Sequence, residues 1–161
     1  MRSGASIEVA APPQAVWDFI SDPAKALHYM AGITRWEVVS DKPQGLGARY
    51  RMLLRVRSAE VGGLVEVVEY DEPRDLAWTS VTGIDQRGRW RLRERPGGHT
   101  DVEFRLSYGV AGAGIFGAIA ERIAAPTVRG HLERTVRQLK RQVEHELQRR
   151  RAAERRRARV G

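Results

Sequence analysis

Apolar residues recur at helical spacing in the last third of the chain. They stand three or four positions apart and form one stripe: Val128, Leu132, Val136, Leu139, Val143 and Leu147. Such a stripe predicts an amphipathic helix that lies on an apolar surface. Because Pro126 removes an internal hydrogen bond near its start, we expect a short helix over 115–124 and then a kink or restart into the long one.

The segments before this helix alternate between apolar and polar residues, as half-buried strands do. In the clearest of them, 48–59, Tyr50, Met52, Leu54 and Val56 share one face and arginines hold most of the other. Gly62 and Gly63 are expected to turn the chain after this strand. The strands expected from this pattern are 6–10, 34–40, 48–59, 64–70, 76–82, 87–95 and 102–110.

Two short helices are expected between the first and second strands. Pro12 and Pro13 suit the first turn of a helix, and Asp22 and Pro23 end it. A second short helix follows over 24–30. The sequence therefore predicts an α+β fold, in which a seven-stranded curved antiparallel sheet wraps around a long C-terminal helix.

Five loose motifs follow one another in a characteristic order over residues 5–147. They are Ile7 to Pro12 leading into Val16-Trp17; Asp22-Pro23 with Tyr29 and Gly32; Gly45 to Tyr50; Glu69 to Arg74 before Leu76-Ala77-Trp78; and Gly97 to Thr100. In this order of elements and motifs the chain resembles the START-like superfamily, also called the helix-grip, Bet v 1-like or SRPBCC fold. It is most similar to the polyketide cyclase/dehydrase and lipid-transport branch. The superfamily includes lipid carriers, hormone receptors and cyclases, so the resemblance implies the fold more narrowly than the function.

Composition narrows the class of protein. With 161 residues, the chain is expected to bury one core. It has no cysteine, which excludes disulfides and thiolate chemistry. No apolar run approaches the roughly 20 residues that span a bilayer, and the N-terminus lacks the apolar segment of a secretory signal. We therefore expect a cytoplasmic protein.

Most of the net charge of +8 lies near the C-terminus. Residues 148–161 hold seven arginines and one glutamate, whereas residues 1–147 are close to neutral. We expect a ligand-binding domain over 1–147 and a basic tail over 148–161 that projects past it. The tail is either a solvated helix end or a weak electrostatic contact for nucleic acid or anionic lipid. The protein is expected to be a monomer or a homodimer.

A sheet that grips a helix can leave a cavity between the two, and aromatic side chains suit its lining. We expect a hydrophobic, lipid-like or polyketide-like ligand there. The alternative is that the same side chains fill the interior completely. The expected lining residues are Tyr29, Trp36, Tyr50, Met52, Leu54, Val67, Trp78, Trp90, Tyr108 and Ile119.

The resemblance also allows a second function, that of a polyketide cyclase or dehydratase using general acid–base chemistry. Glu69, Tyr50 and Tyr108 are the candidate catalytic residues. Glu69 faces the interior if Val65 and Val67 do. Aromatic polyketide cyclases of the superfamily carry an arginine near this position, so the acid here is a departure from their pattern. The alternative is that Glu69 pairs with an arginine at the rim of the sheet.

No cofactor or metal is expected. The stretch from Gly112 to Gly117 matches G-x-G-x-x-G, but no strand follows its helix, as a dinucleotide site requires. The four histidines stand in no metal-binding spacing: His28, His99, His131 and His145.

A third hypothesis concerns the outer face of the sheet as an interaction surface for nucleic acid. Seven arginines alternate with apolar residues on two strands and share that face. The alternative is that they pair with Glu66, Asp101 and Glu103 on neighbouring strands. The arginines are Arg49, Arg51, Arg55, Arg57, Arg89, Arg91 and Arg93.

Overall fold

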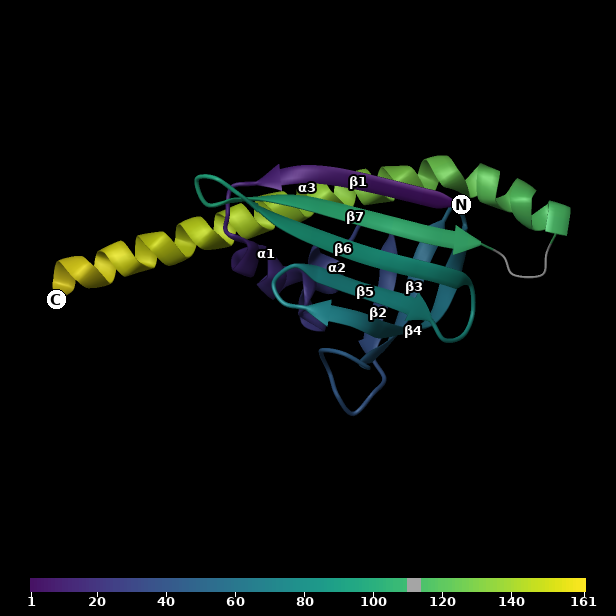
Figure 1. Ribbon diagram of the computed structural model, residues 1–161, viewed down its shortest axis with the longest axis horizontal. Coiled ribbons are helices and arrows are strands. Elements are labelled where there is room, and N and C mark those ends of the chain that lie inside the picture. Colours follow the sequence, from purple (N-terminus) through teal and green to yellow (C-terminus); the bar gives the residue numbers. More distant parts are fainter. Residues whose placement is uncertain (110–113) are drawn as a thin grey trace.

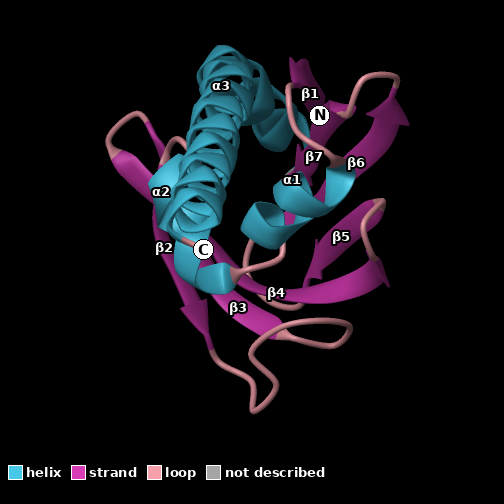
Figure 2. Cartoon of the chain, turned by 90° about the vertical axis from the view of Figure 1, so that its left-hand side faces the viewer, coloured by secondary structure: helices cyan, strands magenta, loops and turns pink. Residues whose placement is uncertain are grey.

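The computed structural model describes residues 1–109 and 114–161, with the side chains of residues 1–109 and 124–161. Its seven strands form one antiparallel sheet in the order β1-β7-β6-β5-β4-β3-β2. Figure 2 shows this sheet curving around the long helix α3, with α1 and α2 on the same concave side. The predicted helix-grip fold is confirmed.

The elements follow the predicted order. Three short helices separate β1 from the other six strands: the α-helices α1 and α2, and the 3-10 helix η1 between them. The long helix α3 follows the last strand. The bounds are β1 Arg2–Val9, α1 Pro13–Ile20, η1 Pro23–Lys25, α2 Ala26–Tyr29, β2 Ile33–Val38, β3 Arg49–Val56, β4 Ala59–Asp71, β5 Asp75–Ser80, β6 Asp85–Arg95, β7 His99–Gly109 and α3 Gly114–Val160.

The apolar stripe of α3 is the central part of the core. Val128, Leu132, Val136, Leu139 and Val143 are all buried, and Leu147 packs at the edge of the same cluster. Thr135 fixes the helix to the segment before β2, because its hydroxyl accepts a hydrogen bond of 2.9 Å from the backbone N–H of Ala31. The predicted stripe therefore faces the sheet.

The expected division into a short and a long helix at Pro126 does not occur. Pro126 lies inside α3, which is a single helix of 47 residues. It continues without interruption through residue 148 and ends at Val160, so its last turns extend beyond the sheet (Figure 1). No helix in the described part of the chain is long and apolar enough to cross a membrane.

The turn between β3 and β4 is also not where the sequence placed it. The chain turns at Arg57 and Ser58, and Arg57 adopts a φ of 56°. Gly62 and Gly63 lie inside β4 instead. There the strands approach so closely that a Cβ on Gly62 would lie 2.0 Å from the Met52 carbonyl oxygen. These glycines permit tight strand packing rather than a hairpin turn.

Candidate functional site

The space between the sheet and α3 has two ends of different composition. At the end near α1 and α2, aromatic rings pack on one another. The Trp90 and Phe104 rings are stacked at 4.0 Å between centroids, and the Trp36 and Tyr50 rings at 5.2 Å. Trp78 joins the two pairs: its ring lies edge-on to that of Trp36 at 5.6 Å and is tilted against that of Phe104 at 5.8 Å. We call this region the aromatic end.

The aromatic end is nearly filled. Its cavity measures about 20 Å³, which is room for about one water molecule. The close packing depends on Gly88, where a Cβ would lie 2.1 Å from the Trp78 ring. Described residues around this cavity include Ser21, Asp22, Tyr29, Trp36, Tyr50, Val67, Tyr70, Trp78 and Trp90.

Two tyrosines at the aromatic end are held in their neutral form. Burial, with smaller effects of Tyr70 and Asp22, raises the pKa of Tyr50 to about 12. Its hydroxyl donates a hydrogen bond of 2.9 Å to the Pro43 carbonyl. Burial also raises the pKa of Tyr29 well above its usual value. Both phenols therefore stay protonated at neutral pH.

The other end of the interior contains open space. A pocket of about 200 Å³ lies between α3 and the ends of β6 and β7, next to the turn that joins β3 and β4. We call it the aliphatic pocket, because its described lining is almost entirely apolar. That lining consists of Leu54, Val56, Ala59, Val61, Gly62, Ile84, Gln86, Leu106, Tyr108, Gly109, Ala124 and Val128.

The predicted lining residues are divided between these regions. Six of them surround the nearly filled aromatic cavity: Tyr29, Trp36, Tyr50, Val67, Trp78 and Trp90. Leu54 and Tyr108 line the aliphatic pocket, and Met52 lies at a small gap of about 20 Å³ that Leu54 also borders. Ile119 lies outside the residues whose side chains are described, as does the glycine motif that begins at Gly112. The role of Ile119 in ligand binding stays a prediction.

Sequence reasoning missed several residues of the aliphatic pocket, among them Val61, Ile84, Gln86 and Leu106. For Gln86 a signal was available. It precedes Trp90 by four positions on the same strand, so the alternation of side chains places both on the concave face.

Comparison with known proteins assigns the chain to a family. Over residues 2–144 the chain matches the model of a family described as polyketide cyclase/dehydrase and lipid transport. The chain belongs to this family. A comparison with curated proteins finds no match.

Solved structures share the fold of this family member at low sequence identity. A protein from Thermus thermophilus is 22% identical, with a TM-score of 0.75 over 89% of this chain and 97% of its own. The Zhui aromatase/cyclase from a Streptomyces species is 16% identical, with a TM-score of 0.77 over 91% and 95%. A START superfamily protein from Mycobacterium smegmatis is 17% identical, with a TM-score of 0.67 over 89% and 97%.

In this polyketide cyclase/dehydrase family member, Glu69 does not face the interior. The pairing of β4 with β5 shifts by one residue between Val67 and Glu69, which is the signature of a β-bulge. The expected alternation is therefore reversed beyond Val67, so Glu69 lies on the outer face and Tyr70 turns inward, where its ring meets Trp17. The expected inward orientation of Glu69 is wrong. Acid–base roles for Glu69, Tyr50 and Tyr108 stay untested predictions.

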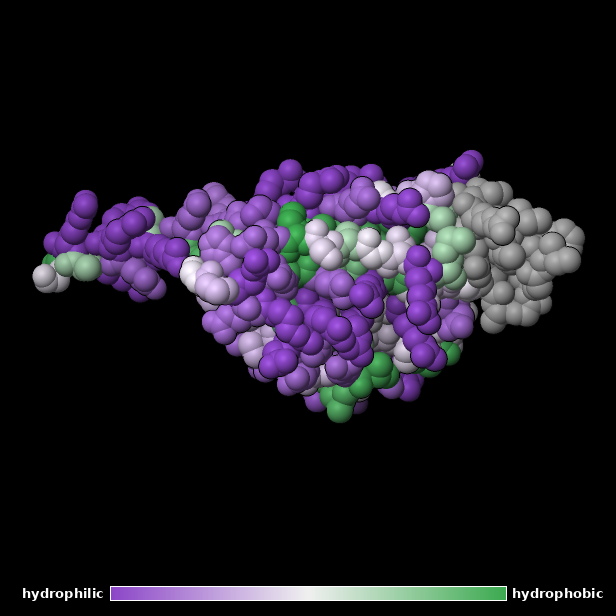
Figure 3. Space-filling model, turned by 45° about the horizontal axis from the view of Figure 1, so that its top comes forward, coloured by the Kyte–Doolittle hydropathy of each residue, from purple (hydrophilic) through white to green (hydrophobic). Residues whose placement is uncertain are grey.

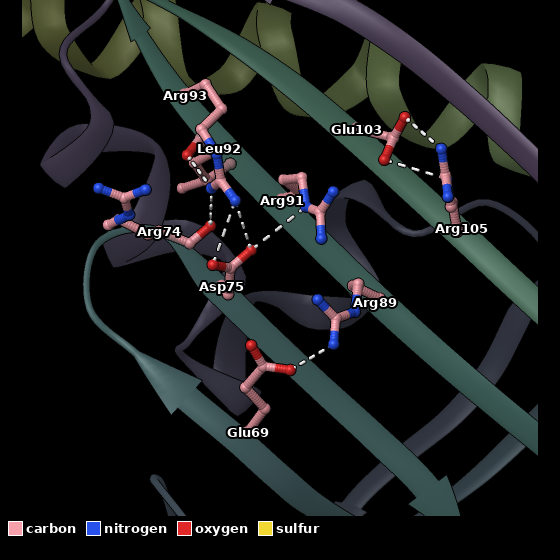
Figure 4. Close-up of polar contacts among 9 residues, drawn as sticks. All are labelled: Glu69, Arg74, Asp75, Arg89, Arg91, Leu92, Arg93, Glu103 and Arg105. Atoms are coloured by element: carbon pink, nitrogen blue, oxygen red, sulfur yellow. Dashed lines mark hydrogen bonds and ion pairs between the residues drawn. The ribbon is translucent and has the colours of Figure 1, made fainter.

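On the outer face Glu69 pairs with Arg89, so the expected arginine partner is present, but the pair spans the central strand β5 rather than the rim of the sheet (Figure 4). Asp75, which is largely buried, lies between Arg91 and Arg93 at 3.5 and 3.3 Å. Arg49 pairs with Glu66, as expected, whereas Asp101 and Glu103 pair with Arg95 and Arg105. Arg55 pairs with Glu60, and Arg57 lies in the turn after β3. Most arginines of this face therefore have acidic neighbours, although no such pair is recorded for the described residues Arg51 and Arg87.

Proposed function

We propose that the protein binds a compact apolar molecule in the aliphatic pocket. The observation that carries this proposal is the contrast within one interior. The aromatic end is packed to about the volume of one water, while about 200 Å³ stays open at the other end. The residues that line this pocket forgo packing contacts there, and a bound ligand would supply them.

The chemistry of the lining supports the same proposal. Leu54, Val61, Leu106 and Val128 offer aliphatic contact, and a ligand that covers them gains roughly 25 cal/mol per Å² of apolar surface removed from water. The family description, which joins lipid transport to polyketide cyclases, and the likeness to an aromatase/cyclase also support an apolar ligand.

The proposal can be tested by filling the pocket from its wall. Val61 lines the pocket, so Val61→Trp places an indole where the ligand would lie. Val68→Trp is the matched control, because Val68 belongs to the same strand but is exposed on the outer face. Leu54→Phe gives a second filling variant in case Val61→Trp folds poorly. Binding of naphthalene is followed by ligand-observed NMR.

The native protein and Val68→Trp should bind naphthalene equally well. Val61→Trp and Leu54→Phe should bind it at least about tenfold more weakly, which corresponds to about 1.4 kcal/mol. Absence of naphthalene binding in the native protein, or equal binding in all four proteins, would refute an aliphatic ligand site.

A separate observation favours a second function for the end of α3, residues 148–160. This end is helical and mostly exposed, and the space-filling view shows a largely hydrophilic projection (Figure 3). Successive helical residues point about 100° apart, so its arginines surround the helix instead of sharing one side. A helix that inserts into a membrane surface needs a broad apolar face. We infer that this end contacts the phosphates of a nucleic acid.

This second function predicts salt-sensitive binding of a DNA duplex, measured by fluorescence anisotropy at low and physiological salt. Changing Arg155, Arg156 and Arg157 to Gln should weaken it at least about tenfold, whereas Arg51→Gln with Arg87→Gln on the sheet should not. Equal effects would assign the contact to the sheet face. Binding to phosphatidylserine vesicles without DNA binding would overturn the nucleic-acid proposal in favour of a lipid one.

A further inference from the structure

The aliphatic pocket contains a buried polar side chain with unused hydrogen-bonding capacity. Gln86 lines the pocket and is only 5% exposed. Its backbone N–H donates to the Ser80 hydroxyl at 3.2 Å. Within the part of the chain that the structure describes, its side-chain amide makes no hydrogen bond. The amide atoms are also not fully enclosed by protein, so they border the open space of the pocket.

A second glutamine, Gln44, lies near the other end of the interior, and its side-chain amide does hydrogen-bond to protein groups. The amide nitrogen of Gln44 lies 3.3 Å from both the Ser21 hydroxyl and the Tyr70 hydroxyl. Gln44 is itself exposed, and it bonds to protein groups at the outer edge of the aromatic end. Gln86 has no comparable partner, although it is the more deeply buried of the two.

The position of Gln86 is fixed by the sheet. It alternates with Gly88 and Trp90 on the concave face of β6, and its cross-strand neighbour on β7 is Tyr108. Leaving a buried amide without partners is costly, since the water that it loses is not replaced. A primary amide can donate from its nitrogen and accept at its oxygen. A ligand with one polar group can therefore recover the lost hydrogen bond.

We propose that Gln86 selects the ligand of the aliphatic pocket: a neutral apolar molecule that hydrogen-bonds through a single carbonyl or hydroxyl group. This inference rests on the proposed function, because it concerns the same pocket. The described lining contains no charged side chain that could pair with a carboxylate or ammonium group, and burying an unpaired charge is costly.

The volume limits the size of this molecule. A cavity of roughly 150 Å³ is known to hold benzene. A pocket of about 200 Å³ therefore suits a single ring with a short substituent, or two fused rings. Acetophenone and α-methylstyrene are matched probes of this size, since they differ only by a carbonyl oxygen in place of a methylene group.

The experiment measures the affinities of both probes for the native protein, Gln86→Leu and Gln44→Leu. Gln86→Leu removes the amide but keeps a side chain of similar volume, and Gln86→Met provides a second variant of similar length. Gln44→Leu makes the same change at the aromatic end. The readout is the ratio of the two dissociation constants in each protein, which cancels any general effect on the pocket.

In Gln86→Leu and Gln86→Met the preference for acetophenone over α-methylstyrene should fall roughly five- to tenfold, as expected for loss of one hydrogen bond. In Gln44→Leu it should not change. Equal ratios in all proteins that bind both probes would overturn the role of Gln86 while leaving the proposed function intact. Tighter binding of benzoate than of acetophenone to the native protein would overturn the neutral ligand class. Binding of neither neutral probe to the native protein would overturn the proposed function itself.

Discussion

At one end of the interior, Trp90 stacks on Phe104 and the remaining cavity is about 20 Å³; at the other, Val61 and Leu106 face about 200 Å³ of open space. The same sheet and the same helix enclose both ends. The difference lies in side-chain volume: tryptophans and stacked rings fill the first end, whereas the described lining of the second is mainly aliphatic residues and Gly62, with Tyr108 as its one aromatic residue. The end of the interior that the stacked aromatic rings occupy is therefore almost completely packed. The candidate site lies at the end whose described lining side chains are mainly small and aliphatic.

The largest effect is expected from removing a ring at the aromatic end. Trp90 is 1% exposed and contacts both Phe104 and Tyr29. Trp90→Ala should lower the free energy of unfolding by about 3–5 kcal/mol. Leu54→Ala should cost less than half as much, because Leu54 already faces open space and loses fewer contacts. Urea denaturation measures both, and equal losses would mean that the two ends are packed alike.

Alkaline pH should also act on the aromatic end. The pKa of Tyr50 rises from 10.0 to about 12 in the folded protein, and that of Tyr29 rises further. Above pH 10 the unfolded chain therefore loses phenolic protons that the folded protein retains. The free energy of unfolding should fall with rising pH, by up to about 1.4 kcal/mol per pH unit for each tyrosine.

Comparison with Tyr50→Phe isolates the contribution of one phenol. This variant loses the bond to the Pro43 carbonyl at every pH, so its stability should be lower at neutral pH. Its further decline from about pH 10 to pH 12 should nevertheless be shallower than that of the native protein. Parallel declines in urea denaturation would show that Tyr50 does not keep its proton in this range.

A smaller effect is expected from adding one methylene group to a residue of β4 at each end of the interior. Val67→Ile at the aromatic end inserts bulk where no space is left, and should destabilise by about 1–3 kcal/mol. Val61→Ile extends into the aliphatic pocket and should be neutral, or stabilise by up to about 0.8 kcal/mol. Thermal unfolding of both variants gives the signs. Equal destabilisation would contradict the open space near Val61.

Much of this fold could be predicted from the sequence because a strand alternates with a period of two. That alternation correctly placed Tyr50, Met52 and Trp90 on the buried face. The burial of the apolar stripe of α3 could be predicted equally well, since an amphipathic helix has few ways to bury one face. The family resemblance then supported one fold for these elements, a curved sheet around the long helix, which the physics of single elements does not specify.

The departures from prediction have local causes that alternation cannot detect. A bulge shifts the register of β4 by one residue, and that single shift exchanges the faces of Glu69 and Tyr70. Gly62 resembles a turn residue, yet it serves close contact with β3. Pro126 stays inside a helix because packing on the sheet outweighs its cost.

The open pocket was the hardest feature to predict. Its volume is a small difference between the space that the curved sheet encloses and the side chains from several elements that occupy it. No single residue carries that information. Gln86 was overlooked because the expected strand begins at residue 87, whereas β6 begins at Asp85 and pairs Gln86 with Tyr108.

The smallest effect is expected at the end of α3, which belongs to neither end of the interior. The described side chains beyond residue 150 are exposed or only partly buried, and Arg150 makes an exposed ion pair of 3.3 Å with Glu146. Such a pair contributes only about 0.3–0.5 kcal/mol. Deleting residues 150–161 should therefore shift the melting temperature by no more than a few degrees and leave naphthalene binding unchanged. Loss of folding or of naphthalene binding in this deletion would mean that the helix end supports the pocket, directly or through a partner subunit.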